Sequence, residues 1–465
     1  MLRTWIAFAI AAGCLMAQTV DKTVPPSTPP LPNFKLPATT ETKLPNGLTL
    51  VTVEDKRFPM VTLRLAFQAG SRWDPQNAPG LAEAVAALLS EGTKTRSSKQ
   101  LAEEVTSIGG AINASASVDT LTIGGSALSE NFEKLLDLAA DVARNATFPA
   151  DEIALYQQNR KQQLLDQRSQ SEFLAEEKLT EVLLGSHPYS RQNPTEASID
   201  ALDAKALAGF RDRLVVPNNG VLILLGKLPE KAVVQKLVAA KFGDWQKKDV
   251  PAAPGGKVPE PKRSITLVDR PGSVQADVHI GQLGLTRTDP QYFALTVANA
   301  ILGGGASSRL FNEIREKKGY AYSVYSHSQP FKDAAMFATV MQVRNEVAGD
   351  AINDMLGLMQ GMADKPVGTQ ELTDVKNYIS GSFVMRLETQ AGLASQLAMV
   401  KSLGLPDDYL SLYTTRIRSA EPDQLQSAAK KVISPANAAI VVVGDAKQIK
   451  PALEKLGPVE VTPAK

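Results

Sequence analysis

An internal repeat constrains this chain more than any other feature of its sequence. A turn, an apolar strand pattern and a glycine occupy 217–226 (PNNGVLILLG), and the same pattern returns at 435–444 (PANAAIVVVG). An alternating apolar segment that ends in Asp-Pro and leads into a helical pattern lies at 61–75, and again at 276–290. The offsets between the halves are 218 and 215 residues. Nearly equal offsets predict a duplicated domain; the alternative is a coincidence between apolar strands.

Each half combines strand patterns with long helical patterns. Asn46-Gly47, just before an apolar alternation, is a strong hairpin-turn signal. Residues 115–125 alternate with period two, whereas 129–144 carry apolar residues at helical spacing. We therefore expect an α+β fold with two homologous domains, each a mainly antiparallel sheet with helices packed on one face.

The domain boundaries follow from composition. A chain of 465 residues is longer than one hydrophobic core usually organises. Residues 249–262 (DVPAAPGGKVPEPK) are rich in Pro and Gly and form the expected linker. The predicted domains are then 45–248 and 263–460.

The N-terminus has the pattern of an export signal. Arg3 supplies a basic start, 5–16 is an apolar stretch too short to span a bilayer with certainty, and Ala17 suits signal-peptidase cleavage. We expect a signal peptide at 1–17, the alternative being a buried helix. Residues 18–44 are rich in Pro and Thr and predict an extended tether.

The only cysteine, Cys14, lies inside this signal. Its context, Ala-Ala-Gly-Cys, resembles a bacterial lipobox, although Ala11 stands where Leu is usual. Two outcomes stay open: a lipid anchor at Cys14, or plain cleavage near Ala17. Either one predicts an exported protein, free in the periplasm or anchored as a lipoprotein that faces it.

The charge balance argues against one class of partner. Lys and Arg total 50 against 49 Asp and Glu, a net charge of +1. This gives no electrostatic basis for binding nucleic acid.

Several motifs together resemble a known family. The segment 80–95 (GLAEAVAALLSEGTKT) is similar to the zinc-binding helix of the insulinase, or pitrilysin-like, zinc peptidases, in which His-x-x-Glu-His follows Gly-Leu-Ala. Further matches are Asn-Gly-Leu at 46–48, Gly109-Gly110, Gly-x-His-Pro-Tyr at 185–189, and GGGASSRLFNEIREKKGYAYSV at 303–324. The resemblance covers about residues 40–460 and is strongest to the mitochondrial-processing-peptidase branch.

The residues that carry the family's chemistry are missing. The resemblance places Glu83, Ala86 and Ala87 where the two imidazoles and the general base belong, and the third metal ligand would fall near Asp166. Zinc sites take three or four ligands, usually with His or Cys, so Glu83 and Asp166 alone could not hold the ion. We therefore expect no metal on this chain and no catalytic residue.

The histidines do not replace the lost ligands. The chain has His187, His279 and His327, and none lies within a helical turn of another. We interpret His187 as structural and His279 as part of a buried strand, and leave open whether His327 lines a cavity.

The substrate-binding side of the chemistry is retained. The resemblance implies that Arg315 and Tyr322 hydrogen-bond a peptide backbone near the scissile bond and help stabilise the oxyanion. A guanidinium offers a fixed fork of donors to carbonyl oxygens, and a phenol donates one more. The alternatives are a solvated helix face for Arg315 and a half-buried strand aromatic for Tyr322.

Three hypotheses follow. In the first, the chain is a non-catalytic, substrate-binding subunit of a heterodimeric zinc peptidase in a bacterial envelope, with zinc on the partner subunit and an unfolded peptide as substrate. In the second, it is a structural or peptide-binding family member with no role in hydrolysis. In the third, it is a hydrolase with an unrecognised site.

Overall fold

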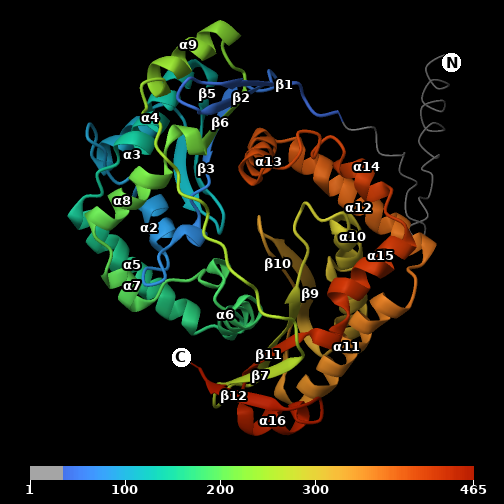
Figure 1. Ribbon diagram of the computed structural model, residues 1–465. Coiled ribbons are helices and arrows are strands. Elements are labelled where there is room, and N and C mark those ends of the chain that lie inside the picture. The colour runs from blue at the N-terminus through green and yellow to red at the C-terminus, as the bar shows by residue number, and fades with distance from the viewer. Residues whose placement is uncertain (1–34, 465) are drawn as a thin grey trace, which may run out of the picture. The chain divides into compact units, whose positions relative to one another are not determined.

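Two six-stranded mixed sheets organise the computed structural model, which describes residues 35–464 (Figure 1). The first sheet has the order β1-β2-β6-β3-β5-β4 and the second the order β12-β7-β11-β8-β10-β9. The strands of the first sheet are β1 (Thr39–Lys43), β2 (Thr49–Glu54), β3 (Met60–Phe67), β4 (Ala111–Ala116), β5 (Leu121–Leu128) and β6 (Gly220–Gly226). Those of the second are β7 (Ser264–Asp269), β8 (Gln275–Leu283), β9 (Ala321–Pro330), β10 (Ala335–Arg344), β11 (Ala439–Gly444) and β12 (Val459–Pro463).

The predicted duplication is visible in the order of the strands. The repeated motif at 217–226 forms β6, and its counterpart at 435–444 contains β11; each strand is third in its sheet. Pairing is antiparallel except for β2–β6 in the first sheet and β7–β11 and β7–β12 in the second. The expected α+β class is confirmed.

Helices surround both sheets. Those of the first half are α2 (Leu81–Leu88), α3 (Ser98–Ser107), α4 (Phe132–Asn145), α5 (Ala150–Arg168), α6 (Ser171–Leu184), α7 (Glu196–Asp200), α8 (Ala204–Leu214) and α9 (Lys231–Phe242). Those of the second half are α10 (Tyr292–Gly303), the π-helix η5 (Phe311–Lys317), α11 (Ala348–Asp364), α12 (Thr369–Leu387), α13 (Gln390–Leu403), α14 (Tyr413–Arg418), α15 (Pro422–Ala428), the π-helix η7 (Ala429–Ile433) and α16 (Ala446–Leu453). Short 3-10 turns are η1 (Ser71–Trp73), η2 (Ser129–Asn131), η3 (Pro188–Ser190), η4 (Pro217–Asn219), η6 (Asn345–Val347) and η8 (Pro435–Asn437).

The central strands of each sheet are buried on both faces, and the second face is covered there by a helix of the other half. Helix α13 of the second half packs on β3 and β6, and α6 of the first half packs on β8 and β11 (Figure 1). The first of these cores includes Leu397 of α13 and Ile223 of β6. The second includes Leu179 of α6 and Val441 of β11. We expected helices on one face of each sheet. Because α13 and α6 each cover the other face of the sheet in the opposite half, β6 and β11 are almost wholly buried.

The folded body extends slightly beyond the expected boundaries. Strand β1 pairs with β2 from Thr39 onward, so the last residues of the expected tether belong to the first sheet. Strand β12 likewise runs to Pro463, beyond the expected end at 460. The predicted signal peptide, Cys14 and most of the tether lie outside the described residues. In the described part of the chain, no helix is both long and apolar enough to span a membrane.

Candidate functional site

Helix α2 carries the positions at which the zinc motif was expected. It follows Gly80, whose φ of 89° is in the left-handed region that favours glycine. The Asp74 carboxylate accepts hydrogen bonds from the backbone N–H groups of Gly80 and Ala82, both at 2.8 Å. Burial raises the pKa of Asp74 to about 7, although these backbone donors favour its ionised form. The start of α2 is therefore held in one place.

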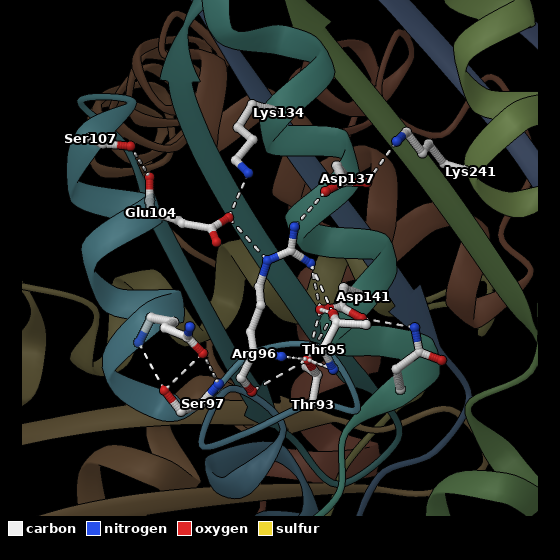
Figure 2. Close-up of polar contacts among 12 residues, drawn as sticks. Thr93, Thr95, Arg96, Ser97, Glu104, Ser107, Lys134, Asp137, Asp141 and Lys241 are labelled. Carbon is white, nitrogen blue, oxygen red and sulfur yellow. Dashed lines mark hydrogen bonds and ion pairs between the residues drawn. The ribbon is translucent and has the colours of Figure 1, made fainter.

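A polar network holds the segment that follows α2 (Figure 2). Arg96 donates to three carboxylates: Glu104 of α3 at 3.0 Å, and Asp137 and Asp141 of α4 at 2.8 and 2.7 Å. Asp141 also accepts from the Thr93 hydroxyl at 2.7 Å. These bonds fasten the loop between α2 and α3 to α4, so both ends of α2 are positioned.

An ion pair occupies the place where metal ligands would converge. Arg160 of α5 donates through Nε to Glu83 at 2.8 Å and through Nη2 to the other carboxylate oxygen at 3.4 Å. Only 6% of the Arg160 side chain is exposed. Arg160 also donates to Gln167 at 3.0 Å. The Glu83 carboxylate, which is partly exposed, is therefore paired with a buried cation.

The neighbouring positions offer no ligand. Ala86 is buried and Ala87 is exposed, and neither methyl group has a lone pair to donate. Asp166 is exposed and accepts from Gln162 on its own helix at 3.1 Å. The residue of α5 that contacts Glu83 is thus Arg160 and not Asp166. Sequence reasoning missed Arg160, because a basic residue in a charged helix carries no signal of burial.

The site does not fit zinc. In the described part of the chain, no three His, Cys, Asp or Glu side chains gather closely enough to hold a metal ion. His187 is buried, and its Nδ1 accepts from the backbone N–H of Tyr189 at 3.2 Å. His279 is buried on β8, and burial lowers its pKa to about 4. His327 lies on β9, where burial likewise lowers its pKa.

Arg315 and Tyr322, the predicted substrate-binding residues, lie close together. The Arg315 guanidinium lies 4.8 Å from the Tyr322 ring centroid and 4.6 Å from that of Phe311. Arg315 stands on η5, Gly319 turns the chain with a φ of 61°, and Tyr322 follows on β9. Cation–π contacts with these two rings hold the Arg315 guanidinium beside Tyr322, and its Nε also lies 3.6 Å from a carboxylate oxygen of Glu316.

Tyr322 is highly exposed although it lies on a strand. Its side chain is 84% exposed, which is unusual for an aromatic residue in a strand. Strand β9 is an edge strand and pairs only with β10 within the described residues. Gly303 permits this arrangement, since a Cβ there would lie 2.4 Å from the backbone nitrogen of Ser326 on β9. The pair therefore adjoins a strand edge that has free backbone groups.

Fold and site together define a class: a duplicated, peptidase-like α+β protein whose metal-binding helix has no ligand set. Residues 49–193 match the family described as Insulinase (Peptidase family M16), and residues 201–379 match the domain described as Peptidase M16 inactive domain. A relative named as an uncharacterized zinc protease from Mycobacterium leprae is 30% identical over 338 residues, covering 67% of this chain and 74% of the relative. The chain belongs to the insulinase family.

Further relatives agree with this assignment. Another protein named as an uncharacterized zinc protease, from Streptomyces coelicolor, is 26% identical over 403 residues, covering 84% of this chain and 86% of its own length. Among solved structures, a peptidase M16 inactive domain from Pseudomonas fluorescens superposes with a TM-score of 0.82 at 28% identity, covering 88% of this chain and 98% of that one. A protease from Helicobacter pylori has the same fold, with a TM-score of 0.82 at 21% identity over 88% and 100% of the two chains.

Proposed function

We propose that this protein is the non-catalytic, substrate-binding subunit of a two-chain insulinase-family zinc peptidase that acts on peptides in a bacterial envelope. The observation that carries the proposal is a contrast between two sites. The metal position holds the Glu83–Arg160 ion pair and two alanines, whereas Arg315 and Tyr322 lie together and Tyr322 is exposed.

The geometry of the retained pair supports a role in holding a peptide. The Arg315 guanidinium offers several N–H donors and the Tyr322 phenol one O–H donor, all suited to backbone carbonyl oxygens. An extended peptide beside Tyr322 would also find the unpaired backbone groups of β9, a common mode of peptide recognition. Donors aimed at developing negative charge are each worth about 3 to 4 kcal/mol in such sites.

The partner supplies what this chain lacks. A subunit with an intact His-x-x-Glu-His motif would bring the zinc and the general base. In this arrangement Arg315 and Tyr322 bind and orient the substrate and do not break a bond themselves. The envelope location rests on the N-terminal sequence, in which a basic start is followed by a short apolar stretch and a small residue.

Co-expression with a candidate zinc-bearing partner and an assay of peptide cleavage tests the proposal. Arg315→Ala or Tyr322→Phe should lower partner-dependent turnover about a hundredfold, by analogy with the removal of one oxyanion-hole donor. Arg344→Ala and Tyr378→Phe are matched controls because both side chains are well exposed and lie elsewhere. Unchanged turnover in both site variants would refute the shared site and favour a family member with no part in hydrolysis.

A further inference from the structure

A cavity of about 510 Å³ lies between the first sheet and helix α13, away from the site described above. Strands β3 and β4 contribute Arg64 and Ser115 to its lining, and Ser117 comes from the loop after β4. Helix α13 contributes Ser402, and Arg287 and Phe331 come from loops of the second half. Phe331 directly follows β9 and is nine residues beyond Tyr322, a separation of about 30 Å in extended chain. The cavity is therefore distinct from the Arg315–Tyr322 pair.

Arg64 has no partner among the described residues. Its Nε is buried without a hydrogen bond, and no carboxylate lies within ion-pair distance of its guanidinium. The guanidinium lies over Gly124 of β5: a Cβ on that glycine would be 2.1 Å from Nη1. A partly buried guanidinium without a counter-charge is costly, and a bound anion would remove that cost.

Arg287 adds a second positive charge that no carboxylate among residues 35–464 neutralises. Its Nη1 donates to the phenol oxygens of Tyr292 at 2.6 Å and Tyr409 at 3.4 Å, and its Nε is buried without a partner. The phenols orient this guanidinium but leave its charge intact, because burial raises the pKa of Tyr409 well above the usual range for tyrosine.

The one carboxylate in the lining, Asp119, is already fully engaged. It accepts from Arg72 at 3.2 Å, from the Tyr189 hydroxyl at 2.6 Å and from the backbone N–H of Lys332 at 2.9 Å. The cavity thus keeps two uncompensated guanidinium groups. Ser402 adds a buried hydroxyl that has no hydrogen-bond partner in the described residues.

The ligand that this lining suits is a carboxylate carried by a peptide. Arginine forks match carboxylates in two parallel hydrogen bonds, and a volume of about 510 Å³ is far larger than a lone inorganic ion needs. Ser115 lies on β4, the exposed edge strand of the first sheet, so the cavity adjoins a strand edge to which a peptide can add. We infer that Arg64 and Arg287 form an anchoring pocket for a peptide carboxylate, either a C-terminus or an acidic side chain. The inference rests on the proposed function and names a feature of its substrate.

Fluorescence polarisation on the purified protein tests this inference with three labelled dodecapeptides of Ala, Ser and Gly. One probe has a free C-terminal carboxylate, the second is amidated, and the third is amidated with one internal Glu. At least one carboxylate probe should bind about tenfold tighter than the neutral amide, as charge-assisted hydrogen bonds provide. The probe that gains affinity identifies the source of the carboxylate.

Two variants remove the preference by different routes. Arg64→Gln deletes the charge, and Gly124→Ala keeps it but displaces the guanidinium. Both should bind all three probes with about equal affinity. Arg344→Gln removes an exposed charge elsewhere and should keep the tenfold preference. Circular dichroism checks that each variant is folded.

Three results would overturn the inference. If the unmodified protein binds neutral and carboxylate probes equally, the anchoring pocket is wrong while peptide binding by the protein stands; this comparison requires no variant. If Arg64→Gln and Gly124→Ala are folded and keep the preference, the carboxylate binds elsewhere. If no probe binds at all, the proposed function fails together with the pocket.

Discussion

Replacing Asp141 with alanine tests the network that positions the end of α2. The Asp141 carboxylate accepts from Thr93 at 2.7 Å, Thr95 at 2.9 Å, Arg96 at 2.7 Å and Asn145 at 2.8 Å. At roughly 1 kcal/mol net for each hydrogen bond, their loss should lower the free energy of unfolding by about 4 kcal/mol. The cost stays near this value because Arg96 keeps two other carboxylate partners and is not left as an unpaired charge.

The pH dependence gives the network a second signature. Burial alone would raise the pKa of Asp141, but hydrogen bonds from Asn145, Thr93, Arg96 and Thr95 together hold it below its usual range. A carboxyl with a lowered pKa in the folded state adds stability above its unfolded pKa of about 4, and this stability is lost as the pH falls. Between pH 5 and pH 3 the unmodified protein should therefore lose stability more steeply than Asp141→Asn.

Urea unfolding followed by circular dichroism measures both effects. Asp249→Ala is the matched control, because this exposed linker carboxylate has no hydrogen bond or ion pair among the described residues; its unfolding free energy should change by less than about 0.5 kcal/mol. A loss of under about 1 kcal/mol in Asp141→Ala, or equal pH slopes for Asp141→Asn and the unmodified protein, would show that the network does not stabilise the fold.

Two further predictions concern the metal position and the exchanged helices. The double variant Glu83→His/Ala87→His should bind zinc only weakly, because it offers two ligands. Adding Arg160→Glu supplies a third ligand and should raise the zinc affinity at least about a hundredfold, as measured with a chromophoric zinc competitor. Equal affinity of the double and triple variants would mean that α5 does not face this position. The two halves of the chain, 1–248 and 249–465, should be poorly soluble when expressed separately, and co-expression should give a soluble complex that co-purifies. If each half folds alone, the packing of α6 and α13 on the sheet of the other half is not needed for folding.

Sequence patterns revealed the elements but not all of their neighbours. The repeated strands β6 and β11 were evident because periodicity is a property of the chain itself, whereas the pair Arg315–Tyr322 was assigned from the resemblance to the family. The helices α6 and α13 also had readable patterns, but which sheet they cover depends on long-range packing that no local signal specifies. Arg160 and Arg64 were missed for the same reason. An arginine looks solvated in sequence, and only the fold shows that one pairs with Glu83 and the other lines a cavity.

The placement of α6 and α13, each on the sheet of the other half, has a consequence for how the protein unfolds. One helix of each half completes a hydrophobic core of the other half, so unfolding of one half exposes apolar side chains of both. A damaging substitution such as Leu397→Ala or Leu179→Ala, at about 2 to 5 kcal/mol, should therefore not yield a molecule with one sound half and one melted half. On heating or in the presence of a protease, the two halves should therefore unfold together in one cooperative transition. The less stable half would set the rate at which the whole chain is degraded.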